Sequence, residues 1–142
     1  MVDASLVVDW VAPRRDLTSP AQEELSRLAE AGDLLLAPSL LWLEVSNALL
    51  TGVRRQRWSG AEADQSERRL LSLPVRPADS PVDLELAYEL SRRHDNHPIY
   101  DMVYVALARR QKTQLITLDR RLAQLLGDPP WLRIPATAEL GG

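Results

Sequence analysis

An α/β fold with a parallel sheet is the fold class that the sequence predicts. Short apolar runs alternate along the chain with amphipathic segments that begin at helix-capping residues, as expected for strands connected by helices. A length of 142 residues and a hydrophobic content of 45% suit one domain with a core of its own. We therefore expect a single domain over residues 1–142, with residues 136–142 forming a loose tail.

The first part of the chain contains two predicted strands and two predicted helices. Met1–Val2 indicates a short first strand, and a helix follows through Leu6–Val11. Ser19 precedes a Pro and lies three residues before a Gln, which is typical of a helix start. This second helix is expected to run to about residue 31 and to stop at Gly32, after which Leu34–Ala37 is predicted to be a buried strand.

The remainder alternates in the same way. Ser39 is expected to cap a long helix that reaches about Gln56, and Ser59 with Glu62 forms a capping box for a helix toward Leu73. A weak edge strand is expected next, because its Pro residues cannot donate to a ladder. This strand is Pro74–Ala78. The predicted helices after it are Ser80–Arg93, Ile99–Gln111 and the short Arg120–Leu126, with a loop at His94–Pro98 between the first two. The last two predicted strands are Leu115–Leu118 and Trp131–Ile134.

The composition excludes several classes of function. Without Cys the chain has no disulfide, thiolate metal site or Cys nucleophile. No apolar stretch approaches the roughly 20 residues that span a bilayer, and the N-terminus lacks the layout of a signal peptide, so we expect a cytoplasmic protein with no membrane partner. A net charge of −3 argues against broad attraction to nucleic acid, although bound divalent cations would change the sign of a local site.

Four acidic residues lie in or next to apolar runs. They are Asp3 behind Met1-Val2, Glu44 within Leu40–Val53, Asp101 within Pro98–Ala108, and Asp119 behind Leu115–Leu118. A carboxylate in an apolar setting must be paired, protonated or bound to a metal, because burying it unpaired costs several kcal/mol. Few basic residues lie beside these four, so together they indicate a cation site.

These carboxylates are expected to converge at one edge of the sheet. Asp3 and Asp119 both follow predicted strands, and ligands of open parallel sheets bind outside the carboxyl ends of the strands. Like charges at close range raise one another's pKa and need a counter-ion. With no Cys and no well-placed pair of His, the ligands would be oxygen atoms, which favour Mg²⁺ or Mn²⁺. Such a metal activates water, so the chemistry implied is phosphodiester hydrolysis.

The four acids also lie in four segments that resemble known motifs. The segments are MVDASLVVDW at 1–10, PSLLWLEVSNAL at 38–49, PIYDMVYVALA at 98–108 and LITLDRRLA at 115–123. In this order and spacing they are similar to the acidic motifs of PIN-domain ribonucleases, and most closely to those of the VapC-type toxins of bacterial toxin–antitoxin pairs. The resemblance covers nearly the whole chain.

This resemblance implies a fold, an activity and partners. The fold would have three layers, with a five-stranded parallel sheet flanked by helices. The activity would be that of a Mg²⁺- or Mn²⁺-dependent endoribonuclease that acts on RNA as the toxin of a type II pair. A homodimer and a VapB-like antitoxin that blocks the acidic groove are also implied. By carry-over the catalytic and metal-binding residues are Asp3, Glu44, Asp101 and Asp119, and Ser5 and Thr117 match the family's small hydroxyl positions beside the first and last acids.

Several residues keep more than one interpretation. Asp119 would also cap the helix that follows it. Asn47, one turn after Glu44, would orient Glu44, contact RNA or form a hydrogen bond in the core. We interpret Tyr104 as a packing residue, and a metal-activated water removes the need for His97 as a general base. Three arginines lie at the end of the long helix, Arg54, Arg55 and Arg57. Their positive charges would either interact favourably with the helix dipole or bind phosphate.

Two other functions stay open beside the toxin. The same domain would serve as an RNA-processing nuclease without a toxin role, or as a non-catalytic binding module. Loss of one or more acids is the natural signature of such a module, whereas all four acids are present in this chain.

Overall fold

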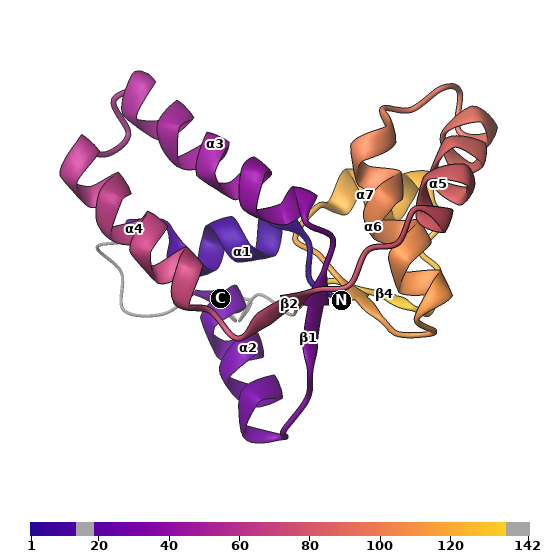
Figure 1. The fold of residues 1–142 in the computed structure, drawn as a ribbon, viewed down its shortest axis with the longest axis horizontal. Helices are drawn as coiled ribbons and strands as arrows, with labels where there is room; N and C mark the ends of the chain where they lie inside the picture. The colour runs from indigo at the N-terminus through magenta and orange to yellow at the C-terminus, as the bar shows by residue number, and fades with distance from the viewer. Residues whose placement is uncertain (14–18, 136–142) are drawn as a thin grey trace, which may run out of the picture.

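The structure is a computed structural model that describes residues 1–13 and 19–135. Over these residues the chain forms seven helices and four short strands (Figure 1). The helices are α1 (Ala4–Val11), α2 (Pro20–Glu30), α3 (Leu40–Arg54), α4 (Gly60–Ser72), α5 (Val82–Arg93), α6 (Ile99–Arg110) and α7 (Arg120–Leu125). The strands are β1 (Leu35–Ala37), β2 (Val75–Pro77), β3 (Leu115–Ile116) and β4 (Leu132–Arg133). The expected tail over residues 136–142 lies outside the described residues.

The strands form two parallel pairs, so the prediction of a five-stranded sheet is wrong. β1 pairs with β2, and β3 pairs with β4. The predicted first strand makes only a single bridge, between Val2 and Ile116. Its shortness has a local cause, because Asp3 already caps α1 and the chain turns into a helix at Ala4.

The first residues nevertheless connect the two pairs. The N–H of Val2 donates to the carbonyl of Leu36 in β1 at 3.0 Å. On the other side, the N–H of Ile116 in β3 donates to the carbonyl of Met1 at 2.9 Å, and the N–H of Asp3 donates to the carbonyl of Ile116 at 3.2 Å. The N-terminal segment therefore lies between β1 and β3, and it ends at Asp3, where α1 begins.

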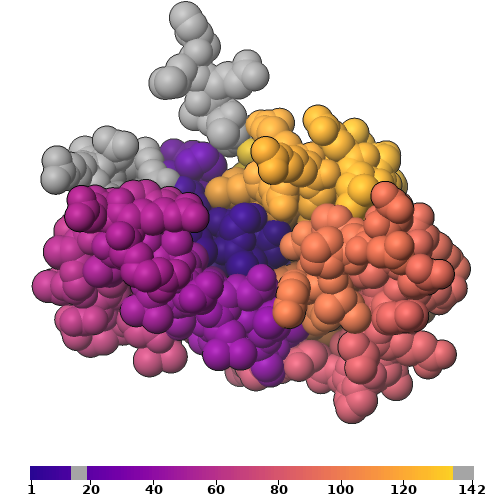
Figure 2. Space-filling model, turned by 90° about the horizontal axis from the view of Figure 1, so that it is seen from above, coloured from indigo at the N-terminus to yellow at the C-terminus, as the bar shows by residue number. Residues whose placement is uncertain are grey.

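Helices lie on both sides of the strands and form two arms (Figure 1). α3 packs against α4, which gives the α3–α4 arm, and α5 packs against α6, which gives the α5–α6 arm. α1 packs against α2, α3 and α4. In the space-filling view the N-terminal residues, drawn in indigo, are visible at the bottom of a hollow between the two arms (Figure 2). The arms therefore form the walls of a groove, and the beginning of α1 lies at its floor.

The predicted starts of α2 and α4 are confirmed, whereas that of α3 is not. Ser19 accepts a hydrogen bond from a backbone N–H in the first turn of α2, and Ser59 and Glu62 form both bonds of a capping box. Ser39 makes no capping bond, because its backbone is already helical and its hydroxyl donates to Asp79 at 2.9 Å. No helix in the described part of the chain has the length and apolar content needed to cross a bilayer.

Candidate active site

The four predicted acids line one small cavity at the floor of the groove. Its volume is about 60 Å³. Each acid belongs to a different part of the fold: Asp3 precedes α1, Glu44 lies in α3, Asp101 lies in the first turn of α6, and Asp119 precedes α7. The remaining lining residues are Ala4, Ser5, Tyr104 and Leu122. The structure thus brings together the four carboxylates that the sequence singled out.

Asp3 is the most deeply buried of the four acids and is held on both oxygens. Its Oδ1 accepts hydrogen bonds from the Ser5 hydroxyl at 2.7 Å and from the Leu6 N–H at 3.1 Å. Its Oδ2 accepts a hydrogen bond from the Thr117 hydroxyl. Burial raises the pKa of Asp3 to about 6, these three hydrogen bonds oppose the rise, and the charge of Asp119 adds to it. The carboxylate is therefore fixed in position but is costly to ionise.

The two small hydroxyl residues connect Asp3 to the segment that carries Asp119. The Ser5 hydroxyl accepts a hydrogen bond from the Leu118 N–H at 3.0 Å, and the Thr117 hydroxyl accepts one from the Asp119 N–H at 2.9 Å. The two hydroxyl oxygens lie 3.2 Å apart. The first and last acidic motifs are thus connected directly, with Ser5 and Thr117 as the connection.

Asp119 both caps a helix and faces the cavity. Its Oδ1 accepts hydrogen bonds from the N–H groups of Arg121 at 3.0 Å and Leu122 at 3.1 Å, at the start of α7. Within the described residues its Oδ2 accepts none. Capping and cation binding are compatible here, because each uses a different oxygen.

Glu44 is oriented by Tyr104, whose hydroxyl donates to Glu44 Oε1 at 2.6 Å. The tyrosine ring is buried in α6. Burial raises the pKa of Glu44, the hydrogen bond from Tyr104 lowers it, and the charge of Asp101 raises it again. The pKa of the Tyr104 hydroxyl is itself raised by burial and by the same carboxylate, so the hydroxyl keeps its proton and remains a donor.

Asp101 is held by His97 and remains partly open to solvent. Its side chain is 41% exposed, and its Oδ2 lies 2.8 Å from Nε2 of His97. His97 belongs to the loop between α5 and α6, where Asp95 and Asn96 both adopt a positive φ. This tight turn brings the imidazole back over the first turn of α6, and one oxygen of Asp101 is thereby held.

Comparison with known proteins identifies the family. Residues 1–126 match the PIN domain family. The chain is 35% identical over 127 residues to "Ribonuclease VapC12" of Mycobacterium tuberculosis, both in strain CDC 1551 / Oshkosh and in strain H37Rv. Each alignment covers 89% of this chain and 92% of the relative. The chain belongs to the PIN domain family.

The cavity of this PIN domain suits a hard divalent cation in its chemistry. All four lining acids offer oxygen ligands, which Mg²⁺ and Mn²⁺ prefer. Three oxygens, Glu44 Oε2, Asp101 Oδ1 and Asp119 Oδ2, accept no hydrogen bond from any described residue. A volume of about 60 Å³ exceeds the roughly 10–15 Å³ that a cavity needs to hold one water, so the cavity has room for an ion with bound water.

The acids of the PIN domain line the cavity without enclosing it. Among the described residues, no three Asp, Glu, His or Cys side chains converge closely enough to hold a metal ion together. This arrangement suits Mg²⁺ better than Zn²⁺, because Mg²⁺ is usually held by one or two carboxylates and keeps several waters. Water and phosphate oxygens would complete the coordination of the bound cation.

The structure adds detail at three residues around the site. Tyr104 packs in the core as expected, and its hydroxyl in addition donates to Glu44, a contact that the sequence could have suggested because a buried tyrosine hydroxyl normally requires a partner. His97 lies four residues before Asp101, a spacing that favours contact on a helix or its first turn. Asn47 is exposed and does not line the cavity, so the structure does not place it against Glu44.

Proposed function

We propose that this PIN domain is a divalent-metal-dependent endoribonuclease that hydrolyses phosphodiester bonds in RNA. One observation carries the proposal: carboxylates from four separate segments line a single cavity at the floor of an open groove. Mutual repulsion would disfavour such a cluster unless cations bind it. The relatives named ribonuclease VapC12 support the same activity.

The chain's own residues would position the reaction. A Mg²⁺ or Mn²⁺ ion in the cavity would neutralise phosphate charge and lower the pKa of a bound water. Asp3 would be the fixed ligand, because both its oxygens are held by hydrogen bonds. Tyr104 would hold Glu44, and His97 would hold Asp101, so that each keeps its second oxygen toward the cavity.

The biological role we propose is that of the toxin in a type II toxin–antitoxin pair, acting in the cytoplasm on cellular RNA. A VapB-like antitoxin would then block the acidic groove. A homodimer is also proposed, and Val82 and Leu84 on α5 support it, because these large apolar side chains are 63% and 61% exposed. The alternatives are an RNA-processing nuclease without a toxin role and a non-catalytic binding module.

The first test is a single substitution at Asp101. Asp101→Asn keeps the size of the side chain and removes its charge, so cleavage of a random-sequence RNA pool with Mn²⁺ should fall by at least about 100-fold. Asp128→Asn is the matched control, because Asp128 is exposed and lies outside the cavity. Full cleavage by a folded Asp101→Asn variant would contradict the proposed active site.

Expression in bacterial cells separates the toxin from the alternatives. The wild-type chain should arrest growth, and co-expression of the antitoxin encoded beside it should restore growth. Cleavage of RNA without growth arrest would favour the RNA-processing role. Binding of RNA without any cleavage would favour the binding module.

A further inference from the structure

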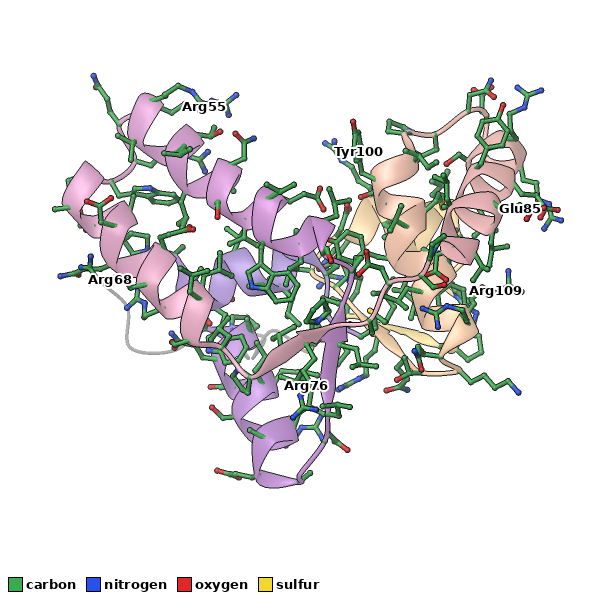
Figure 3. The ribbon with its side chains drawn as sticks, viewed as in Figure 1. Arg55, Arg68, Arg76, Glu85, Tyr100 and Arg109 are labelled. Atoms are coloured by element: carbon green, nitrogen blue, oxygen red, sulfur yellow. The ribbon has the colours of Figure 1, made fainter. Side chains whose placement is uncertain are left out.

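The exposed side of α3 carries a line of polar residues that leads away from the acidic cavity. A helix has 3.6 residues per turn, so residues 11 apart point in nearly the same direction. Glu44 and Arg55 have this separation, and Asn47, Thr51 and Arg54 lie on neighbouring positions between them. We call these five residues the α3 stripe. It connects the floor of the groove with the far end of the α3–α4 arm, where Figure 3 labels Arg55.

Positive charge collects at the far end of this stripe. Arg54, Arg55 and Arg57 are all exposed, and none of them forms an ion pair with a described residue. Between Glu44 and Arg54 the helix carries no other charge. One cation in the last turn is expected from the helix dipole, but three unpaired arginines exceed that need in a chain whose net charge is −3.

The two arginines at the end of α5 differ from these three. Arg92 donates to Asn96 at 2.5 Å, and Arg93 forms an ion pair with Glu89. Their guanidinium groups are therefore engaged within their own arm. On the α3 side, Arg54 donates only to the neutral Thr51 hydroxyl, at 2.8 Å. Of the arginines that end α3 and α5, those of α3 thus keep their charge available. Arg109, Arg120 and Arg121 elsewhere on the surface are also exposed and form no ion pair with a described residue.

The arginines stand on a well-anchored turn. The indole N–H of Trp58 donates to the Leu49 carbonyl at 2.9 Å, and the ring lies directly against Gly52, where a Cβ would come within 2.1 Å of it. The Arg57 guanidinium lies 5.5 Å from the centre of the same ring, a cation–π distance. A fixed turn lowers the entropy that the arginines would lose on binding a ligand.

We propose that the α3 stripe is the track for the RNA backbone, with Arg54 and Arg55 each holding a phosphate away from the site of cleavage. This inference rests on the proposed nuclease function and adds where the substrate leaves the active site. The acidic floor repels phosphate wherever no cation is bound, so affinity for the backbone must come from cations elsewhere. The α3 stripe supplies them on a line of polar residues that begins at Glu44 and is bordered by the exposed side chains of Leu43 and Leu50.

The length of α3 sets the size of the RNA that reaches this contact. Eleven residues of helix span about 16 Å. Phosphates of a stacked strand follow one another about every 3.4 Å along its axis, so the arginines lie about five nucleotides from the cavity, and fewer for an extended strand. An RNA of three nucleotides is therefore too short to span the cavity and these arginines together, whereas one of sixteen is long enough.

The salt dependence of RNA binding tests this track. The probe is a fluorescent pool of 16-nucleotide RNAs of random sequence, and anisotropy is measured in EDTA over a range of salt concentrations. Each phosphate contact on a single strand adds about 0.7 to the slope of log affinity against log salt. Arg54→Ala with Arg55→Ala should therefore flatten the slope by about 1.4, and Arg54→Lys with Arg55→Lys should preserve it.

The matched control removes two arginines from other parts of the surface, Arg76→Ala with Arg109→Ala (Figure 3). This control should keep the wild-type slope. An unchanged slope in the Arg54/Arg55 variant, or the same flattening in the control, overturns the track. Failure of the wild type to cleave the pool with Mn²⁺ overturns the proposed nuclease function instead, so the two results are separate.

Discussion

Asp3 shows most clearly how burial and charge oppose each other in this site. The residue is only 7% exposed, and burial raises its pKa from 3.8 to about 6 despite three hydrogen bonds to the carboxylate. An isolated buried acid would be a defect of the fold. Here the free-energy cost of burying an ionised carboxylate falls on a residue that would bind a cation. A bound cation would offset this cost and favour the deprotonated form, because a metal ligand must be deprotonated.

This raised pKa predicts how stability depends on pH. An acid with a higher pKa in the folded state keeps its proton more tightly when folded, so its contribution is most favourable below the unfolded pKa and is lost as the pH rises through the folded pKa. The change from 3.8 to about 6 corresponds to on the order of 3 kcal/mol. In EDTA, urea unfolding should show that the wild type loses this much relative to Asp3→Asn between about pH 4 and pH 7. A constant difference between the two chains over that range would contradict the pKa of Asp3.

The hydroxyl of Tyr104 gives a second prediction at the scale of one residue. Tyr104→Phe removes one hydroxyl and leaves the ring, so the fold should be retained, while Glu44 loses a hydrogen bond worth about 1.5–3 kcal/mol to a charged group. We expect RNA cleavage at pH 7 to fall about tenfold, since 1.4 kcal/mol is a factor of ten. The pH of half-maximal activity should also rise, because this hydrogen bond lowers the pKa of Glu44.

The exposed Tyr88 provides the control for this substitution. Its side chain is 63% exposed on α5, so Tyr88→Phe should keep both the rate and the pH profile. If Tyr104→Phe changes the rate but leaves the pH profile in place, the hydroxyl has a structural role and does not act through Glu44.

At the scale of the elements, local sequence signals sufficed where the cause was local. The capping residues Ser19 and Ser59 and the apolar runs placed the helices and most strands within a few residues, because caps and periodicity act within one or two turns. Ser39 has the right residue type for a cap, but a contact with Asp79, 40 positions away, takes its hydroxyl. The fifth strand is missing for a similar reason. Asp3 caps α1 and lines the cavity, so the chain becomes helical before a longer strand can form.

The candidate site divides in the same way. The four acids could be predicted because charge within apolar sequence is visible without a structure. Their neighbours could not be, since the partners Glu44 and Tyr104 lie 60 positions apart and only the tertiary fold brings their side chains together at the cavity. Residues that carry the charge are thus easier to predict than residues that orient it.

The turn between α3 and α4 gives a prediction at the same scale. In Gly52→Ala the new Cβ would lie 2.1 Å from the Trp58 ring, and the ring cannot move away without losing its bond to Leu49. Overpacking of this kind costs about 1–3 kcal/mol, which exceeds the roughly 1 kcal/mol that Ala gains over Gly in a helix. Urea unfolding should show a net loss for Gly52→Ala. Gly60→Ala, which meets no atom within 4 Å, should be neutral or stabilising, and equal effects at the two glycines would contradict the proposed packing.

The whole molecule separates its charges along the groove. Acids line the floor, and unpaired arginines stand at the far end of one wall. A cation at the floor would make the entire groove attractive to phosphate, whereas without it the floor repels the backbone that the arginines attract. Binding of metal and binding of RNA are therefore expected to favour each other.

Thermal unfolding with and without Mn²⁺ tests the floor of the groove without knowledge of the substrate. A ligand at a hundred times its dissociation constant stabilises the folded state by about 2.7 kcal/mol, so the wild type and the Asp128→Asn control should both unfold several degrees higher with Mn²⁺ at pH 8. Asp3→Asn and Asp101→Asn should gain less, because each removes a ligand charge from the cavity. The gain of the wild type should also shrink at pH 5, where Asp3 retains its proton. If all four chains respond to Mn²⁺ alike, the carboxylates do not share a cation, and the raised pKa of Asp3 would then belong to the apolar core alone.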